Sequence, residues 1–234
     1  MGSHGRLAGV ALQLEDEEQA GLHEPRRVED LPPLPTPNLS VQRSESTTGC
    51  TVVLVIIGLC VGFPNAVTAS QGWKWPGPNE PWDGQAIGLT ILYSEAVIAL
   101  ICLLGLMFGD PGVLKRSPER CFPLPEQVAN RLRTGQSLVG LDNVYEDGHV
   151  YCVRCCVWRT MPVGKARYRD VDVHHCSVCQ RCVRHFDHHC GVFGRCIAGN
   201  GLGGNMGYFK VILLMAFAGI VTCFATVLAG STRR

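Results

Sequence analysis

Three long apolar runs limit the folds that this chain can adopt. They cover residues 51–70, 86–109 and 207–230, and each contains at most one charged residue. A helix needs about twenty mostly apolar residues to cross the hydrocarbon core of a bilayer. The runs therefore predict an α-helical integral membrane protein with three visible transmembrane helices.

The segments between the runs differ in charge, which predicts how the helices are oriented. Residues 1–48 are rich in Gly, Glu, Arg, Pro and Ser, a composition that predicts a disordered cytosolic tail. The 71–85 connection has Lys74 as its only basic residue and is predicted to be lumenal, whereas the basic 110–206 region is predicted to be cytosolic. The formal net charge of +1 gives no electrostatic reason to expect a nucleic-acid partner.

The segment from Tyr151 to Cys196 holds eight of the thirteen cysteines and five of the eight histidines. Its two CxxC pairs are typical of structural zinc sites, which need four nitrogen or sulfur ligands each. This spacing favours zinc over a disulfide scaffold. Two such sites would be filled by Cys152, Cys155, Cys176, Cys179, Cys182, Cys196, His175 and one of His188 and His189.

Cys190 lies outside this count. Cys190 directly follows Asp187, His188 and His189, and a thiol beside a histidine and an aspartate is a typical activated nucleophile. We therefore expect a nucleophilic cysteine held between two structural metal sites. A purely structural zinc domain with an unused thiol is the alternative.

The run CSVCQRCVRHFDHHC, preceded by YCVRC and followed by FGRCIAGN, resembles the cysteine-rich domain of the DHHC-type protein S-acyltransferases, or palmitoyltransferases. The turn Asp110-Pro111-Gly112 after the second apolar run also matches a motif of that family. The resemblance implies a membrane protein, normally of four helices, with a small cytosolic zinc-binding domain at 150–200. It also implies a C-terminally truncated member, because the chain stops at Arg234 before a fourth helix and a Thr-Thr-x-Glu motif.

The resemblance assigns roles to individual residues. Two structural Zn²⁺ ions would each be held by three cysteines and one histidine. The first set would be Cys152, Cys155, His175 and Cys182, and the second Cys176, Cys179, His189 and Cys196. Cys190 would be the nucleophile, His188 its general base and Asp187 the residue that orients His188. Arg167 and Arg169 are expected to bind coenzyme A phosphates or anionic lipid headgroups.

The activity that the resemblance implies is protein S-palmitoylation. Palmitoyl-CoA would donate its acyl group to Cys190, which would pass it to a cysteine of a substrate protein in a ping-pong reaction. The expected partners are the lipid bilayer, acyl-CoA and cysteine-containing proteins at the cytosolic membrane face. The expected location is the Golgi, the endoplasmic reticulum or the plasma membrane.

Several departures from the family pattern favour an alternative. Gly191-Val192-Phe193 stands where the family has Pro-Trp after the catalytic cysteine, and Arg195 stands where it has Asn. The chain between Cys155 and His175 is also longer than usual. The alternative is a catalytically inactive, truncated zinc-binding membrane adaptor of the same fold. Two local ambiguities also remain open: Cys156 could replace Cys155 as a ligand, and Glu95 could line a substrate cavity or serve helix packing.

Overall fold

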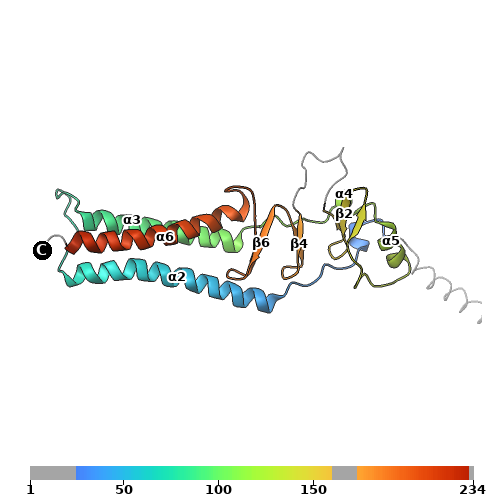
Figure 1. Ribbon diagram of the computed structural model, residues 1–234, viewed down its shortest axis with the longest axis horizontal. Helices are drawn as coiled ribbons and strands as arrows, with labels where there is room; N and C mark the ends of the chain where they lie inside the picture. The colour runs from blue at the N-terminus through green and yellow to red at the C-terminus, as the bar shows by residue number, and fades with distance from the viewer. Residues whose placement is uncertain (1–24, 160–172, 232–234) are drawn as a thin grey trace, which may run out of the picture. The chain divides into compact units, whose positions relative to one another are not determined.

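The computed structural model describes residues 25–159 and 173–231. The chain divides into two compact units. Figure 1 shows the chain coloured by residue number. Unit 1 contains the chain up to Pro37 and residues 113–184, and unit 2 contains residues 38–112 and 185–234.

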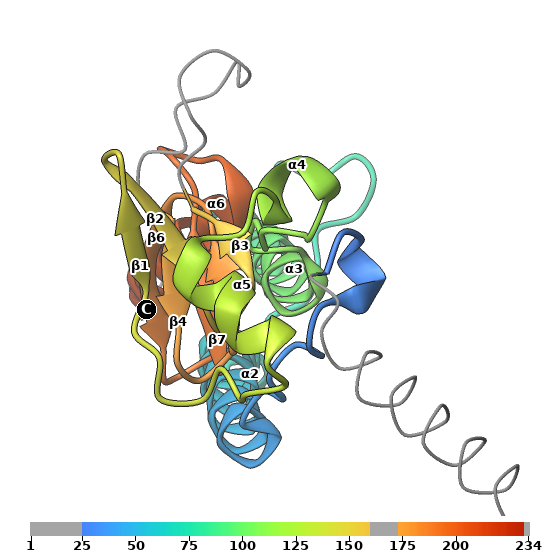
Figure 2. The same cartoon turned by 90° about the vertical axis from the view of Figure 1, so that its right-hand side faces the viewer.

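Three long helices form most of unit 2. They are α2 (Leu39–Ser70), α3 (Gly84–Phe108) and α6 (Gly204–Ser231), which lie side by side in Figure 1, while Figure 2 shows α2 and α3 nearly end-on. Each is long and apolar enough to cross a membrane. The predicted class, an α-helical membrane protein with three visible transmembrane helices, is confirmed.

A close approach of backbones joins α3 to α6. A Cβ atom added at Gly88 of α3 would overlap the side chain of Thr226 of α6. Thr226 is itself only 1% exposed. Small residues allow membrane helices to approach in this way, because association there depends on packing rather than on the hydrophobic effect. Gly88 therefore sets the α3–α6 contact.

Replacement of Gly88 by valine is expected to separate α3 from α6. Overpacking of this kind destabilises a protein by about 1–3 kcal/mol, and the measurement is the melting temperature of the purified chain followed by helical circular dichroism. Gly58→Val is the matched control, because nothing lies within 4 Å of a Cβ atom added there. Equal melting temperatures for the two variants would contradict the packing role of Gly88.

The N-terminal region is more ordered than its composition predicts. Helix α2 begins at Leu39 rather than near Thr51, capped by the Asn38 side chain, which accepts a hydrogen bond from the backbone N–H of Val41. The described residues before it include the 3₁₀ helix η1 (Val28–Asp30). The expectation of a disordered tail through residue 48 is therefore wrong from residue 25 onward.

Two arginines of unit 1 account for the order of the proline-rich stretch. Arg116 donates a hydrogen bond to the carbonyl of Pro32 at 2.7 Å, and Arg181 donates one to the carbonyl of Pro35 at 2.8 Å. Proline carbonyls are acceptors that an extended proline-rich segment cannot satisfy internally. Leu31, 6% exposed, anchors the same stretch in the core of unit 1.

Unit 1 is built from short strands and two short helices. The strands β1 (Val144–Glu146), β2 (His149–Cys152) and β3 (Val157–Trp158) form an antiparallel sheet in that order, and β4 (His174–Cys176) pairs with β5 (Arg181–Val183). The helices are α4 (Pro118–Cys121) and α5 (Glu126–Arg133). The core includes Tyr151, Val157, Trp158 and several of the predicted metal ligands, so a small apolar core and a metal site share the same space.

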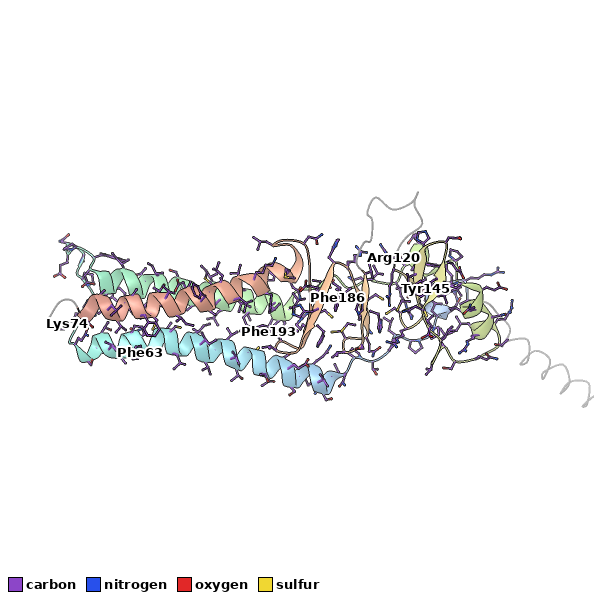
Figure 3. All side chains as sticks on the ribbon, in the orientation of Figure 1. Phe63, Lys74, Arg120, Tyr145, Phe186 and Phe193 are labelled. Carbon is purple, nitrogen blue, oxygen red and sulfur yellow. The ribbon has the colours of Figure 1, made fainter. Side chains whose placement is uncertain are left out.

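A third hairpin belongs to unit 2. It consists of β6 (Phe186–Cys190) and β7 (Arg195–Ala198), paired antiparallel. Figure 3 places Phe193, from the turn of this hairpin, at one end of the three helices and Lys74 at the opposite end. The hairpin therefore lies at the end of the helices remote from the 71–83 connection.

Candidate metal centres and nucleophile

The first group of potential metal ligands lies within unit 1. It consists of Cys152, Cys155, His175 and Cys182, all buried, with their ligand atoms within 4.8 Å of one another. The Nδ1 atom of His175 lies 3.3 Å from the Cys155 sulfur, 3.6 Å from that of Cys152 and 3.9 Å from that of Cys182. Three sulfurs and one imidazole nitrogen in this arrangement match a closed structural zinc site.

The ionisation of these thiols fits a cation-binding role. The thiols of Cys155 and Cys182 donate hydrogen bonds to the sulfur of Cys152 and hold the pKa of Cys152 far below its usual range. The same contacts raise the pKa values of Cys155 and Cys182. A divalent metal bound here would allow all three thiols to ionise.

Arg159 supplies a positive charge beside this group. Burial disfavours its charged form, but its interactions with Cys152 and Cys182 outweigh burial and raise the pKa of the guanidinium. A zinc ion with three thiolates and one neutral histidine would carry a net charge of about −1. Arg159 can balance that charge.

The second predicted set of metal ligands, Cys176, Cys179, His189 and Cys196, is divided between the two units, and each pair is described within its own unit. Cys176 and Cys179 lie on the β4–β5 hairpin of unit 1, where the backbone N–H of Cys179 donates to the Cys176 sulfur at 3.3 Å. His189 and Cys196 face each other across β6 and β7 in unit 2, with the Nδ1 atom of His189 4.0 Å from the Cys196 sulfur. The cysteine and histidine ligands of both predicted sets are the types that zinc prefers.

The turns of the three hairpins show an internal repeat. The sequences HCSVCQRC (175–182) and HCGVFGRC (189–196) have the same spacing. In each turn a backbone N–H donates a hydrogen bond to the carbonyl four residues earlier. The pairs are Gln180 to Cys176 and Gly194 to Cys190, both at 2.8 Å. Gln180 and Gly194 both have positive φ, at 52° and 63°, as does Cys156 at 52° in the equivalent position after Cys155. Cys190 therefore occupies the first-ligand position of a zinc-knuckle turn whose second ligand is replaced by Phe193.

The β6 strand carries a bulge at Asp187. Phe186 pairs with Ala198 and His188 pairs with Ile197, so Asp187 is the extra residue on β6. Adjacent residues of a regular strand point to opposite faces, and a bulge re-aims them. Here the bulge brings the Asp187 Oδ2 atom to 2.7 Å from the Nδ1 atom of His188.

His188 and Cys190 are two residues apart on the same strand and therefore share a face. The His188 ring packs edge-on against Phe209 of α6, with ring centroids 5.7 Å apart. Among the described residues we find no hydrogen bond between the His188 ring and the Cys190 thiol. Catalytic contacts of this kind commonly shorten only when substrate binds.

Cys190 is buried, at 7% exposure, in an apolar cluster at the end of the three helices. We call this set the nucleophile cluster; its buried members besides Cys190 are Val53, Cys102, Leu103, Leu106, Phe193, Ile197, Met206 and Ile212. All three long helices contribute to it. The only thiol of the DHHC tetrad therefore lies against the apolar helices rather than in either metal group of the described chain.

A cavity lies between the three helices. Val53 and Ile212 of the nucleophile cluster also line this cavity, together with Leu92, Ala99 and Glu95. Glu95 accepts a hydrogen bond from the Thr222 hydroxyl at 3.0 Å, and its other carboxyl oxygen is buried with no hydrogen-bond partner among the described residues. Glu95 therefore fits both the helix-packing and the cavity-lining interpretations, because it joins α3 to α6 and also lines the cavity.

The remaining predicted residues fall in different places. Arg167 and Arg169 lie outside the described residues. Cys156 is in neither metal group, and its thiol donates to the carbonyl of Val153 at 3.4 Å. Arg195 donates a hydrogen bond to the carbonyl of Gly109 at 2.7 Å, which ties β7 to the end of α3.

One contact of this site was not predicted. The Glu45 carboxylate, from the region expected to be disordered, lies 3.0 Å from the Nε2 atom of His189. The two residues are 144 positions apart, and no spacing rule connects them. From the sequence alone, a glutamate just before an apolar run is interpreted as an ordinary surface residue.

Comparison with known proteins agrees with this geometry. Residues 146–233 match the family model of the DHHC palmitoyltransferases. The match covers β2 to α6, and so includes all eight potential ligands, the Asp-His-His-Cys tetrad and the third long helix. No curated protein matches the chain.

Proposed function

We propose that this chain, whose residues 146–233 match the DHHC palmitoyltransferase family model, transfers a fatty acyl group from acyl-CoA to cysteines of substrate proteins through an acyl-Cys190 intermediate. The observation that carries this proposal is the pairing of Asp187 with His188 on the strand that ends at Cys190, a thiol that belongs to neither metal group. A structural zinc domain would have no use for this arrangement.

In the first half-reaction, His188 removes the thiol proton of Cys190 through Nε2, while Asp187 holds the Nδ1–H and stabilises the imidazolium. The sulfur attacks the thioester carbonyl of acyl-CoA and forms a new carbon–sulfur bond. The bond to the coenzyme A sulfur breaks, and this sulfur leaves with the proton from His188. In the second half-reaction a substrate cysteine attacks the acyl-Cys190 thioester in the same way, which regenerates the free Cys190 thiol.

The surroundings of Cys190 support a lipid substrate. The nucleophile cluster and the cavity between the helices share the apolar residues Val53 and Ile212, so the cavity borders the cluster that holds the thiol. Burial of each CH₂ group contributes about 0.8 kcal/mol. A long acyl chain that enters between the helices beside these apolar residues would bring its thioester to the nucleophile and hold it there.

Metal binding would fix the hairpins rather than take part in the chemistry. When bound, zinc would hold Cys152, Cys155, His175 and Cys182 in one set and Cys176, Cys179, His189 and Cys196 in the other. His189 and Cys196 flank Cys190 in sequence, so the second set would fix the turn that presents the nucleophile.

The proposal extends to partners and location. Arg167 and Arg169 would bind the coenzyme A phosphates, and the substrate proteins would approach from the cytosol. By the positive-inside rule the metal-binding region lies on the cytosolic side of the Golgi, endoplasmic reticulum or plasma membrane.

The purified, zinc-loaded chain in lipid nanodiscs, incubated with an alkyne analogue of palmitoyl-CoA, tests the proposal. We expect a label on the protein that hydroxylamine removes, as it does for thioesters, followed by transfer to an added cysteine peptide. A zinc-loaded, folded chain that acquires no label would instead identify a catalytically inactive membrane adaptor.

Replacement of Asp187 by asparagine is expected to slow acylation of Cys190 by about 10²–10⁴-fold. The amide can no longer stabilise a protonated His188, although its size is unchanged. The measurement is the single-turnover rate of labelling, with zinc content as the check on folding. Asp142→Asn, at an exposed position of unit 1, is the control, and equal rates for the two variants would rule out the orienting role of Asp187.

A further inference from the structure

Helix α2 starts well before its apolar portion, and this early part packs on the β6–β7 hairpin within unit 2. The Ser46 hydroxyl donates to the carbonyl of Phe193 at 2.9 Å, and a Cβ atom added at Gly49 would lie 2.6 Å from the Phe193 ring. Gly194 lies against the carbonyl of Gln42 so closely that no side chain fits there. The first turns of α2 are therefore held in a fixed position on the turn that follows Cys190.

Glu45 lies within this docked part of the helix. Its side chain is 24% exposed and that of His189 is 14% exposed, so the contact between them is largely shielded from water. The Glu45 Oε2 atom lies 3.0 Å from His189 Nε2, and the other ring nitrogen, Nδ1, faces the sulfur of Cys196. The two nitrogens of one imidazole thus face a potential metal site on one side and a carboxylate on the other.

We propose that Glu45 is a positioning residue for metal binding: its carboxylate accepts the Nε2–H of His189 and presents Nδ1 to the second zinc ion. Histidine ligands commonly donate their second ring N–H to a carboxylate, which selects the tautomer, orients the ring and raises the basicity of the ligand nitrogen. This inference rests on the metal-binding part of the proposed function. It extends the zinc centre to a residue of the first long helix, outside the 146–233 match.

Because α2 is held in a fixed position, the Glu45 carboxylate can orient the His189 ring. A glutamate on a mobile surface segment would gain little from an exposed pair. Because Ser46, Gly49 and Gly194 fix the helix, the Glu45 side chain needs little further ordering to reach His189. The contact also couples α2 to the turn that carries Cys190.

The test is the rate at which a coloured chelator, 4-(2-pyridylazo)resorcinol, removes zinc from the full-length chain in nanodiscs. We expect Glu45→Ala to release one of the two zinc ions about 10–100-fold faster than the unaltered chain, the range seen when outer-shell partners of metal ligands are removed. The other ion should be released at its original rate. Glu45→Gln should give a smaller acceleration, because the amide oxygen still accepts the Nε2–H.

Two controls separate this role from simple packing. Ser46→Ala removes a docking contact of α2 but leaves the Glu45 carboxylate, and Glu80→Gln removes a negative charge from the exposed 71–83 connection. Glu80→Gln should release zinc at the original rate, and Ser46→Ala should accelerate release less than Glu45→Ala does, because Gly49 and Gly194 still hold the helix on the hairpin. Unchanged release from Glu45→Ala, or equal acceleration by Ser46→Ala, would overturn the inference while leaving the acyl-transfer proposal intact. A chain that binds no zinc at all would overturn both.

Discussion

Replacement of Cys190 by serine is expected to abolish the hydroxylamine-sensitive label from the palmitoyl-CoA analogue. A serine hydroxyl at this position has almost the same size but is far less ionised than a thiol, and the Asp187–His188 pair is arranged to serve one nucleophile. Loss of an activated nucleophile costs on the order of 10³-fold or more in rate. Labelling over time, followed by in-gel fluorescence with and without hydroxylamine, measures the loss.

The same experiment needs a matched thiol and a check on folding. Cys50 of α2 packs against the nucleophile cluster but has no histidine–aspartate pair beside it, so Cys50→Ser should keep the label. Zinc content should stay unchanged in Cys190→Ser, because Cys190 is not one of the potential ligands. A label that survives in Cys190→Ser and disappears in Cys50→Ser would show that we have assigned the wrong nucleophile.

The second large effect is expected from the first metal group. Cys182→Ala should remove one zinc ion and unfold unit 1, because Cys182 is fully buried in the core that also holds Cys152 and Cys155. Zinc binding contributes about 10–16 kcal/mol of apparent folding free energy in zinc-finger peptides. That is comparable to the whole stability of a domain, about 5–15 kcal/mol.

Hydrogen exchange can locate this effect. The amides of β1, β2 and β3 should lose protection in Cys182→Ala, whereas those of α2, α3 and α6 should keep it, since their hydrogen bonds lie within each helix. Cys156→Ala removes a thiol from the same core without touching the ligand group and should keep both zinc ions. Full protection of the three strands in Cys182→Ala would mean that the apolar core alone holds unit 1 together.

The elements that hydropathy and spacing control were predictable from the sequence. Uninterrupted apolar runs predict α2, α3 and α6 because nothing but a helix satisfies the backbone of a single span in a bilayer. The CxxC spacing predicts metal knuckles because two thiols three residues apart reach one ion from a single turn. Both signals are local and need no knowledge of which segments meet.

The parts that depend on distant contacts were not predictable. The order of residues 25–37 depends on Arg116 and Arg181, whose partners are about 84 and 146 positions away. The bulge at Asp187 depends on how β6 pairs with β7, and no residue type in the sequence FDHHC predicts it. One local signal was available and overlooked: HCSVCQRC and HCGVFGRC repeat at equal spacing, with Phe193 in place of a cysteine.

Helix α2 is continuous from Leu39 to Ser70, and its Pro64 lies near the end remote from the hairpin. The same helix therefore contacts the turn after Cys190 through Ser46 and lines the cavity between the helices from Val53 onward. Helices adjust to bilayer thickness chiefly by tilting. Under the proposed function, a change in lipid chain length is therefore expected to change the alignment of Cys190 and with it the rate at which Cys190 is acylated.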